Sequence, residues 1–441
     1  MAKSREAGPL SGFRDILAEQ KIPRDHMIST IKGVYEGYGF TPLDTPIVER
    51  QETLSGKYGD EGEQLMYKFT DHGDRLLALR YDLTVPLARV VGQHRDEITL
   101  PYKRYQIGPV FRGESPQAGR YREFVQFDAD TVGTNSVLAD AEVVAMMSDT
   151  MDALGADALI RVNNRLLLDA LVTKAGIQEP TDARALVGTI DKVEKIGKDA
   201  ALASIAERFN QRTAALVSEF LTADGNNQDR LKNLDALLKG EPTAEEGISN
   251  LLQVFGIIEA AGYKPEQITF DQTIARGLNY YTGIIYETSL KAKPEIGSVC
   301  SGGRYDNLVK DLGGPDLPAV GTSVGVDRLF TALSELGQLE TAKTTSEAMI
   351  VNFGTKDGGV YMKVAAALRK AGIPTEIHLD EGKVGKQLKF ANKMGIPYVV
   401  MMGSNELESN TAMVKNMDSG EQMEVPMDQV SDYINSQKNA S

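Results

Sequence analysis

Short runs of apolar residues separated by polar turns dominate the first third of the chain, after a helical pattern at residues 26–40. Residues 41–50 contain two prolines, which place this segment at the start or edge of a strand because proline has no N–H to give to a sheet ladder. β-Branched and aromatic runs follow at residues 65–71, 75–82, 102–112 and 122–133. Successive strands joined by short turns predict an antiparallel sheet.

The middle of the chain has a different period. Residues 165–260 show apolar positions at helical spacing throughout, which predicts an all-helical insertion. Strand patterns return at residues 268–290 and 298–303, and residues 319–336 are predicted to form a glycine-rich turn that leads into a helix. We therefore expect the sheet to be interrupted by the insertion and then resumed.

The end of the chain alternates strand and helix patterns. Strands are expected at residues 348–353, 375–379 and 398–403, and helices at residues 359–372 and 383–395. This spacing predicts a small α/β domain with parallel pairing. The predicted fold class is an α+β catalytic domain with a mainly antiparallel sheet flanked by helices, a helical insertion, and a small C-terminal α/β domain. The expected boundaries are 1–164 with 261–335, then 165–260, then 346–441.

Composition limits the class of protein. A chain of 441 residues is too long for one ordinary core, so several domains are expected. No apolar run is long enough to cross a bilayer, and the N-terminus lacks the apolar segment of a signal peptide, so no membrane association and a cytoplasmic location are expected. One cysteine and four scattered histidines predict no disulfide, no protein-held metal and no permanently bound cofactor.

The charge distribution favours a local nucleic-acid surface over a general one. The net charge of -14 argues against nonspecific phosphate binding, which needs clustered Lys and Arg. Residues 346–441 hold 10 basic against 12 acidic residues, so this region is nearly neutral. In it, Lys383, Lys386, Lys389 and Lys393 recur at steps that place them on one helix face. Such a row is usually a solvated surface, and it is also a candidate for following a phosphate backbone.

The segment from Tyr102 to Asp130 contains the densest candidate chemistry. It combines four arginines and four acidic residues with aromatic rings, and its alternation predicts a hairpin that presents arginines on one face. Arginine binds phosphate in a bidentate manner, and a neighbouring aromatic ring can stack on a purine. A nucleotide site and an exposed hairpin whose charges pair with one another fit this spacing equally well.

A family resemblance separates these two interpretations. The run FRGESPQAGRYREFVQFDAD resembles motif 2 of class II aminoacyl-tRNA synthetases, in the form found in the histidyl-tRNA synthetase family. GTSVGVDRLF is similar to motif 3, and GFTPLDTPIVER is similar to motif 1, which implies a homodimer with Pro46 at its interface. ARGLNYYTGIIYE and CSGGRYDNL resemble the two histidine-specific motifs of the same family.

The resemblance implies an enzyme that activates L-histidine with Mg-ATP and transfers it to the 3′ end of tRNA(His). Arg276 and Arg112 would be catalytic, through charge stabilisation at the α-phosphate. The implied ATP-binding residues are Arg112, Glu114, Arg120, Arg122, Phe124 and Arg328. The implied histidine-binding residues are Asp82, Thr84, Arg112, Gln126, Asp130, Arg276, Tyr280 and Tyr281. Gln117 and the four lysines, in a domain that resembles an anticodon-binding domain, would contact tRNA.

Two departures and two alternatives accompany the resemblance. Asp82 stands where many bacterial members have Glu, and Asn279 replaces the usual Asp of the RGLDYY motif. One alternative is a synthetase-like regulatory subunit of histidine biosynthesis that does not charge tRNA. The other is a different class II synthetase, such as a prolyl or threonyl enzyme. The terminal α/β domain, Arg276 and the RGLNYY segment favour the histidyl enzyme over both.

Overall fold

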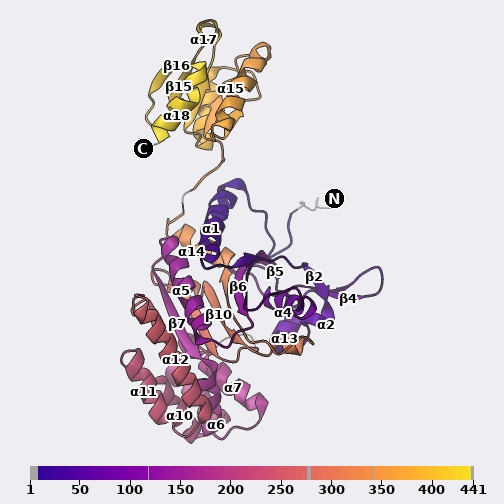
Figure 1. The fold of residues 1–441 in the computed structure, drawn as a ribbon, viewed down its shortest axis with the longest axis vertical. Helices are drawn as coiled ribbons and strands as arrows, with labels where there is room; N and C mark the ends of the chain where they lie inside the picture. The colour runs from indigo at the N-terminus through magenta and orange to yellow at the C-terminus, as the bar shows by residue number, and fades with distance from the viewer. Residues whose placement is uncertain (1–7, 118, 276–279, 340, 439–441) are drawn as a thin grey trace, which may run out of the picture. The chain divides into compact units, whose positions relative to one another are not determined.

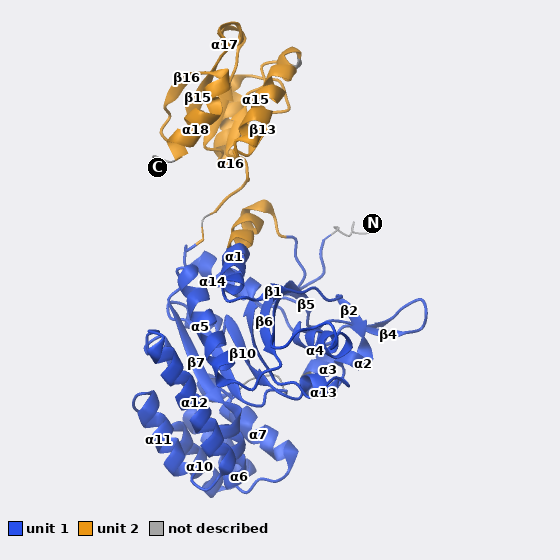
Figure 2. Cartoon of the chain, viewed as in Figure 1, with its two compact units in different colours: residues 1–15, 27–338 blue, residues 16–26, 339–441 orange. Residues whose placement is uncertain are grey.

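A computed structural model describes residues 8–117, 119–275, 280–339 and 341–438. The chain divides into two compact units, residues 1–15 with 27–338 and residues 16–26 with 339–441 (Figure 2). Each unit has its own sheet, and those residues expected to bind histidine and ATP that the structure describes belong to the first unit.

The first unit is built on an eight-stranded sheet in the order β1-β5-β6-β11-β10-β9-β7-β8. Its strands β5, β6, β7 and β10 are labelled in Figure 1. The outer pairs β1–β5 and β7–β8 are parallel and the five inner pairings are antiparallel, so the predicted mainly antiparallel sheet is confirmed. The strands are β1 Thr41–Pro42, β5 Tyr102–Phe111, β6 Glu123–Val132, β7 Ala158–Asn164, β8 Ile268–Phe270, β9 Ile284–Leu290, β10 Cys300–Tyr305 and β11 Ala319–Gly325.

A smaller sheet and several helices complete this unit. The strands β2 (Val48–Arg50), β4 (Leu76–Leu79) and β3 (Lys68–Thr70) form a separate antiparallel sheet, which the sequence pattern did not distinguish from the main one. The flanking helices are the part of α1 (Ala18–Gly37) from Met27 onward, α2 Gln51–Leu54, α3 Gly59–Leu65, α4 Thr84–Gln93, α5 Val137–Ala153, α13 Leu308–Asp311 and α14 Val326–Glu335.

The predicted glycine-rich turn at the start of residues 319–336 is wrong. Residues 319–325 form strand β11, which pairs with β10 on one side and with β6 on the other. Its glycines make room between neighbours: a Cβ on Gly321 would lie 1.9 Å from the Asp130 carboxylate, and a Cβ on Gly302 of β10 would lie 2.1 Å from the Gly321 carbonyl oxygen. These glycines therefore permit close contact between strands. In the sequence alone, glycines at this spacing look like a turn.

The predicted helical region between β7 and β8 is confirmed (Figure 1). Asparagine side chains at positions 164, 210 and 226 cap three of its helices by accepting hydrogen bonds from backbone N–H groups of the first turn. The helices are α6 Arg165–Lys174, α7 Pro180–Ile190, α8 Val193–Ile196, α9 Lys198–Arg208, α10 Gln211–Leu221, α11 Asn227–Leu237 and α12 Pro242–Ala260.

The second unit contains a five-stranded sheet in the order β13-β12-β14-β15-β16. The three predicted strands pair in parallel, and two further strands extend the sheet in antiparallel fashion, which the sequence pattern missed. The elements are β12 Ala348–Ile350, α15 Gly358–Lys370, β13 Thr375–Ile377, α16 Val384–Met394, β14 Tyr398–Met401, α17 Ser404–Ser409, β15 Thr411–Asn416, β16 Gln422–Pro426 and α18 Val430–Lys438.

Candidate active site

A cavity of about 320 Å³ opens over the middle of the large sheet. This volume suits a small-molecule ligand. Ten of the predicted site residues line it, together with residues from β9, β10 and β11. The ten are Asp82, Thr84, Arg112, Glu114, Arg120, Phe124, Gln126, Tyr280, Tyr281 and Arg328.

The hairpin β5–β6 supplies one wall of the cavity. Its ladder runs from Tyr102 opposite Val132 to Phe111 opposite Glu123, which confirms the expected hairpin. Because alternate residues of a strand share a face, Phe124 and Gln126 both point to the cavity. The Gln126 amide donates to Ser323 Oγ of β11 at 2.6 Å, which orients this side chain across the floor.

Arg112 lies where β5 ends and the connecting loop begins. Its Nε donates to the Tyr81 carbonyl at 3.1 Å, and its guanidinium carbon lies 4.4 Å from the Tyr81 ring centre and 5.2 Å from that of Phe124. Nε is bound to the backbone and Arg112 lines the cavity, so the outer nitrogens of this planar group are the ones left to bind a ligand. Such a group suits a phosphate or carboxylate.

Asp82 forms an acidic end of the cavity. Its carboxylate accepts hydrogen bonds from the Tyr58 hydroxyl at 2.9 Å, the Val85 N–H at 3.0 Å and the Tyr280 hydroxyl at 3.2 Å. Burial raises the pKa of Asp82, while these donors and Arg112 act in the opposite direction. A ligand ammonium group placed here would supply the missing positive charge.

Asp130 lies behind the cavity wall and does not line it. It is 2% exposed and forms an ion pair with the fully buried Arg104 at 2.6 Å, and it accepts a hydrogen bond from the Tyr305 hydroxyl. The Tyr305 ring packs edge-on against Tyr280, which does line the cavity. Sequence reasoning missed Arg104 as the partner, although the facing position of these two residues on a hairpin could have revealed it.

The remaining predicted residues lie elsewhere. Arg122 donates to the Glu114 carbonyl at 3.0 Å and to the Ser11 carbonyl at 3.2 Å, so its guanidinium is used to hold backbone. Gln117 forms an isolated bridge with Arg120 in the loop. Lys383 precedes α16 and Lys386, Lys389 and Lys393 lie on it, all four exposed, in the second unit. Arg276 and Asn279 lie outside the described residues.

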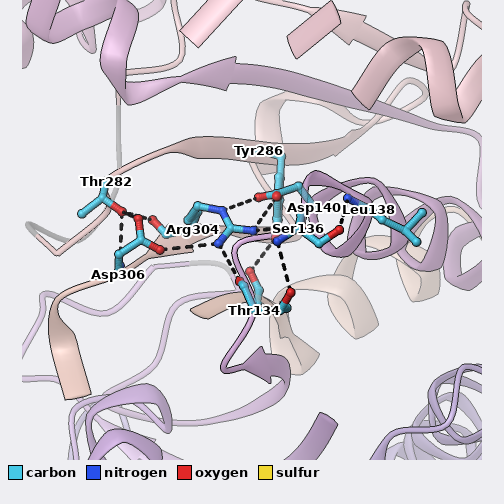
Figure 3. A network of polar contacts seen from close by, with 9 residues as sticks. Thr134, Ser136, Leu138, Asp140, Thr282, Tyr286, Arg304 and Asp306 are labelled. Atoms are coloured by element: carbon cyan, nitrogen blue, oxygen red, sulfur yellow. Dashed lines mark hydrogen bonds and ion pairs between the residues drawn. The ribbon is translucent and has the colours of Figure 1, made fainter. Parts of the chain in front are cut away.

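A polar network around Arg304 holds the chain segment that follows Tyr281 (Figure 3). Arg304 donates through Nε and Nη2 to the buried Asp140, and through Nη1 to the Thr134 carbonyl at 3.1 Å. Asp306 accepts a 2.6 Å hydrogen bond from the Thr282 hydroxyl. Thr282 directly follows Tyr281, so this network fixes the tyrosine wall of the cavity against α5 and β10.

Asp128 lies between Gln126 and Asp130 on the same strand face, and its buried carboxyl should make the stability of the protein depend on pH. Burial raises its pKa to about 7, with Arg104 lowering it and Asp130 raising it. Its unfolded pKa is about 3.9, so the folded protein binds the proton more tightly and stability falls as pH rises from about 4 to 7. The free energy of unfolding of Asp128→Asn, relative to that of the parent, should therefore be higher at pH 8 than at pH 5 by about 1 kcal/mol or more. Urea unfolding at both pH values measures this difference, and a pH-independent difference would contradict it.

Within the described ranges, no group of three or more His, Cys, Asp or Glu side chains is placed to hold a metal ion. Among the helices in those ranges, none combines the length and apolar character needed to span a bilayer.

Comparison with known proteins gives matches over nearly the whole chain. Residues 12–329 match the family described as histidyl-tRNA synthetase, and residues 347–437 match an anticodon binding domain. The histidine–tRNA ligase of Rhodopirellula baltica is 41% identical over 94% of this chain and 94% of its own length. That of Clostridium tetani is 39% identical over 95% of this chain and 96% of its own length. The histidyl-tRNA synthetase structure from Nostoc sp. matches with a TM-score of 0.87 at 34% identity, covering 99% of this chain and 100% of that one.

Proposed function

Because the chain belongs to the histidyl-tRNA synthetase family, we propose that the cavity over the large sheet binds L-histidine and ATP side by side. The protein is an aminoacyl-tRNA ligase that forms histidyl-adenylate and then charges tRNA(His). In the first step the histidine carboxylate attacks the α-phosphorus of ATP and pyrophosphate leaves. In the second, a hydroxyl of the terminal adenosine of tRNA attacks the acyl carbon and AMP leaves.

We assign the loop end of the cavity to ATP. This end is lined by Glu114, Arg120, Phe124 and Arg328. The Arg120 Nη1 lies 3.6 Å from the Glu114 Oε2. Phe124 offers a flat apolar face for adenine, and Arg328, whose Nη1 donates to the Ser298 carbonyl at 2.6 Å, is a cation oriented for the other face. Arg122 supports the loop through the backbone contacts given above. Mg²⁺ enters with ATP as part of the substrate.

We assign the tyrosine-lined end to L-histidine. Asp82, Thr84 and Gln126 suit the ammonium group, and Tyr280 and Tyr281 surround the position of the side chain. Asp130 acts from behind this wall, through the Tyr305 hydroxyl and ring. A pocket of this kind rejects other amino acids because a wrong side chain leaves its buried polar groups unpaired. Arg112 lies between the two ends, where the carboxylate meets the α-phosphate, and Arg276 is proposed to assist it.

The wider organisation follows from the same premise. We propose a catalytic domain of residues 1–164 and 261–335, an insertion of residues 165–260, and an anticodon-binding domain of residues 346–441. We also propose that the protein forms a homodimer through the segment around Pro46. It would act in the cytoplasm, where its tRNA substrate is found.

The lysines of α16 give a testable tRNA surface. The double variant Lys386→Ala with Lys389→Ala should raise the KM for tRNA about tenfold, because two exposed cations that face phosphate are lost. Aminoacylation kinetics measure this KM. ATP–pyrophosphate exchange without tRNA should be unchanged. Lys363→Ala with Lys370→Ala, a matched pair exposed on α15, should leave the KM for tRNA within about twofold. Equal effects of the two pairs would contradict the assignment.

The observation that carries the proposal is the meeting of Arg112, Phe124, Gln126, Tyr280 and Arg328, from distant parts of the chain, around one cavity. The test is ATP–pyrophosphate exchange with each of the twenty amino acids, followed by charging of tRNA. Exchange stimulated by an amino acid other than histidine would refute the assignment. Histidine-dependent exchange without charging would instead favour a regulatory protein that has kept the synthetase fold.

A further inference from the structure

The N-terminal segment Leu10–Arg14 packs on the loop that joins β5 to β6. The Gly12 carbonyl accepts a hydrogen bond from the Arg122 N–H at 2.9 Å, and the Ser11 carbonyl accepts from Arg122 Nη1 at 3.2 Å. Gly12 has φ +85°, and a Cβ there would lie 2.7 Å from Arg122 Cγ. The Phe13 ring contacts the Tyr67 ring edge-on at 6.2 Å. The backbone of this segment therefore holds the end of the loop where β6 begins, while Phe13 packs on Tyr67 just before β3.

Arg14 connects that loop to the opposite wall of the cavity. Its guanidinium carbon lies 3.6 Å from the centre of the Tyr121 ring, and its Nη2 forms an ion pair with Asp327. Both Tyr121 and Asp327 line the cavity. Asp327 is 2% exposed, and its other oxygen accepts a 2.7 Å hydrogen bond from the Val125 N–H of β6. Arg14 thus joins the loop to the first turn of α14, and Asp327 joins that turn to β6.

The position of these contacts relates them to ATP. Tyr121 directly follows Arg120, and Asp327 directly precedes Arg328, so the two contacts of Arg14 lie beside two residues assigned to ATP. A surface loop is mobile unless its ends are held, and a cation stacked on a ring while paired with a buried carboxylate holds both groups in one geometry. Among the residues that the structure describes, Arg14 has no hydrogen bond, ion pair or ring contact with the tyrosine-lined histidine end.

We propose that Arg14 is a positioning residue for ATP, which sets the distance between the β5–β6 loop and the start of α14 before the nucleotide binds. This inference rests on the proposed assignment of that end of the cavity to ATP. Arg14 acts through Tyr121 and Asp327, so its loss should weaken ATP binding selectively.

The experiment is histidine-dependent ATP–pyrophosphate exchange with the full-length protein, with the KM measured separately for ATP and for histidine. Arg14→Ala should raise the KM for ATP about tenfold and leave the KM for histidine within about twofold. Arg14→Lys should give an intermediate value, because lysine retains the charge for Asp327 but has no planar group to stack on Tyr121. Gly12→Ala should reproduce the alanine effect, since its Cβ displaces the segment from Arg122.

Arg95→Ala is the matched control, because Arg95 is an exposed arginine paired only loosely with its neighbour Asp96 at 3.9 Å. It should leave both KM values unchanged. An unaltered KM for ATP in Arg14→Ala, or an equal rise in both KM values, would overturn the proposal. If Arg14→Ala gives one of these results while Arg112→Ala abolishes exchange in the same assay, only the proposal for Arg14 is wrong. If Arg112→Ala also exchanges normally, the assignment of the cavity itself is wrong.

Discussion

Replacement of Arg112 by alanine is expected to lower the rate of histidine-dependent ATP–pyrophosphate exchange by about a thousandfold. The guanidinium is held between the Tyr81 carbonyl and the Tyr81 and Phe124 rings, so its outer nitrogens are oriented before substrate arrives. A preorganised cation stabilises the charge that develops on the α-phosphate without a reorganisation cost. The loss should therefore appear mainly in kcat.

Arg112→Lys tests whether geometry or charge matters. Lysine keeps the charge but lacks the planar fork that binds two oxygens at once and stacks between two rings. We expect it to recover only part of the lost rate. Arg120→Ala is the matched comparison, because Arg120 lines the same cavity but is about half exposed, with 46% side-chain exposure. It should mainly raise the KM for ATP. Near-normal turnover in Arg112→Ala would exclude Arg112 from the chemistry.

Replacement of Asp130 by alanine is expected to destabilise the protein by about 3–5 kcal/mol, in addition to weakening histidine binding. Asp130 and Arg104 are both buried, and they form an ion pair at 2.6 Å. Removing the carboxylate leaves the buried Arg104 guanidinium without its ion-pair partner, and desolvation of an unpaired charge is costly. Urea unfolding measures the loss of stability, and the shift of the unfolding midpoint with added histidine measures binding.

A double variant separates the two effects of Asp130. Arg104→Met with Asp130→Ala removes both charges, so it should be more stable than Asp130→Ala alone while histidine binding stays weak. If the double variant were less stable than the single one, the buried guanidinium would not be the cause. If histidine shifted the midpoint of Asp130→Ala as far as that of the parent, Asp130 would have no role in recognition.

Local patterns predicted the framework of this fold well. The period of two at residues 102–112 and 122–133 identified the hairpin β5–β6, and helical spacing identified the region between β7 and β8. Strand β11 was missed because its glycines are there for contact with neighbouring strands, which no local pattern reveals. Strands β15 and β16 lie at the end of their sheet, and the sequence pattern did not predict them as strands.

The sequence alone determined which residue types are available for chemistry, since the hairpin arginines, the paired tyrosines and the motif resemblance are all readable along the chain. Only the tertiary structure decided their partners. It joined Tyr280 to Asp82 and Arg14 to Asp327, the latter a pair separated by 313 positions. The physical reason is that a side chain's partner depends on which strands and helices become neighbours, and that choice is made by packing of the whole sheet rather than by local periodicity.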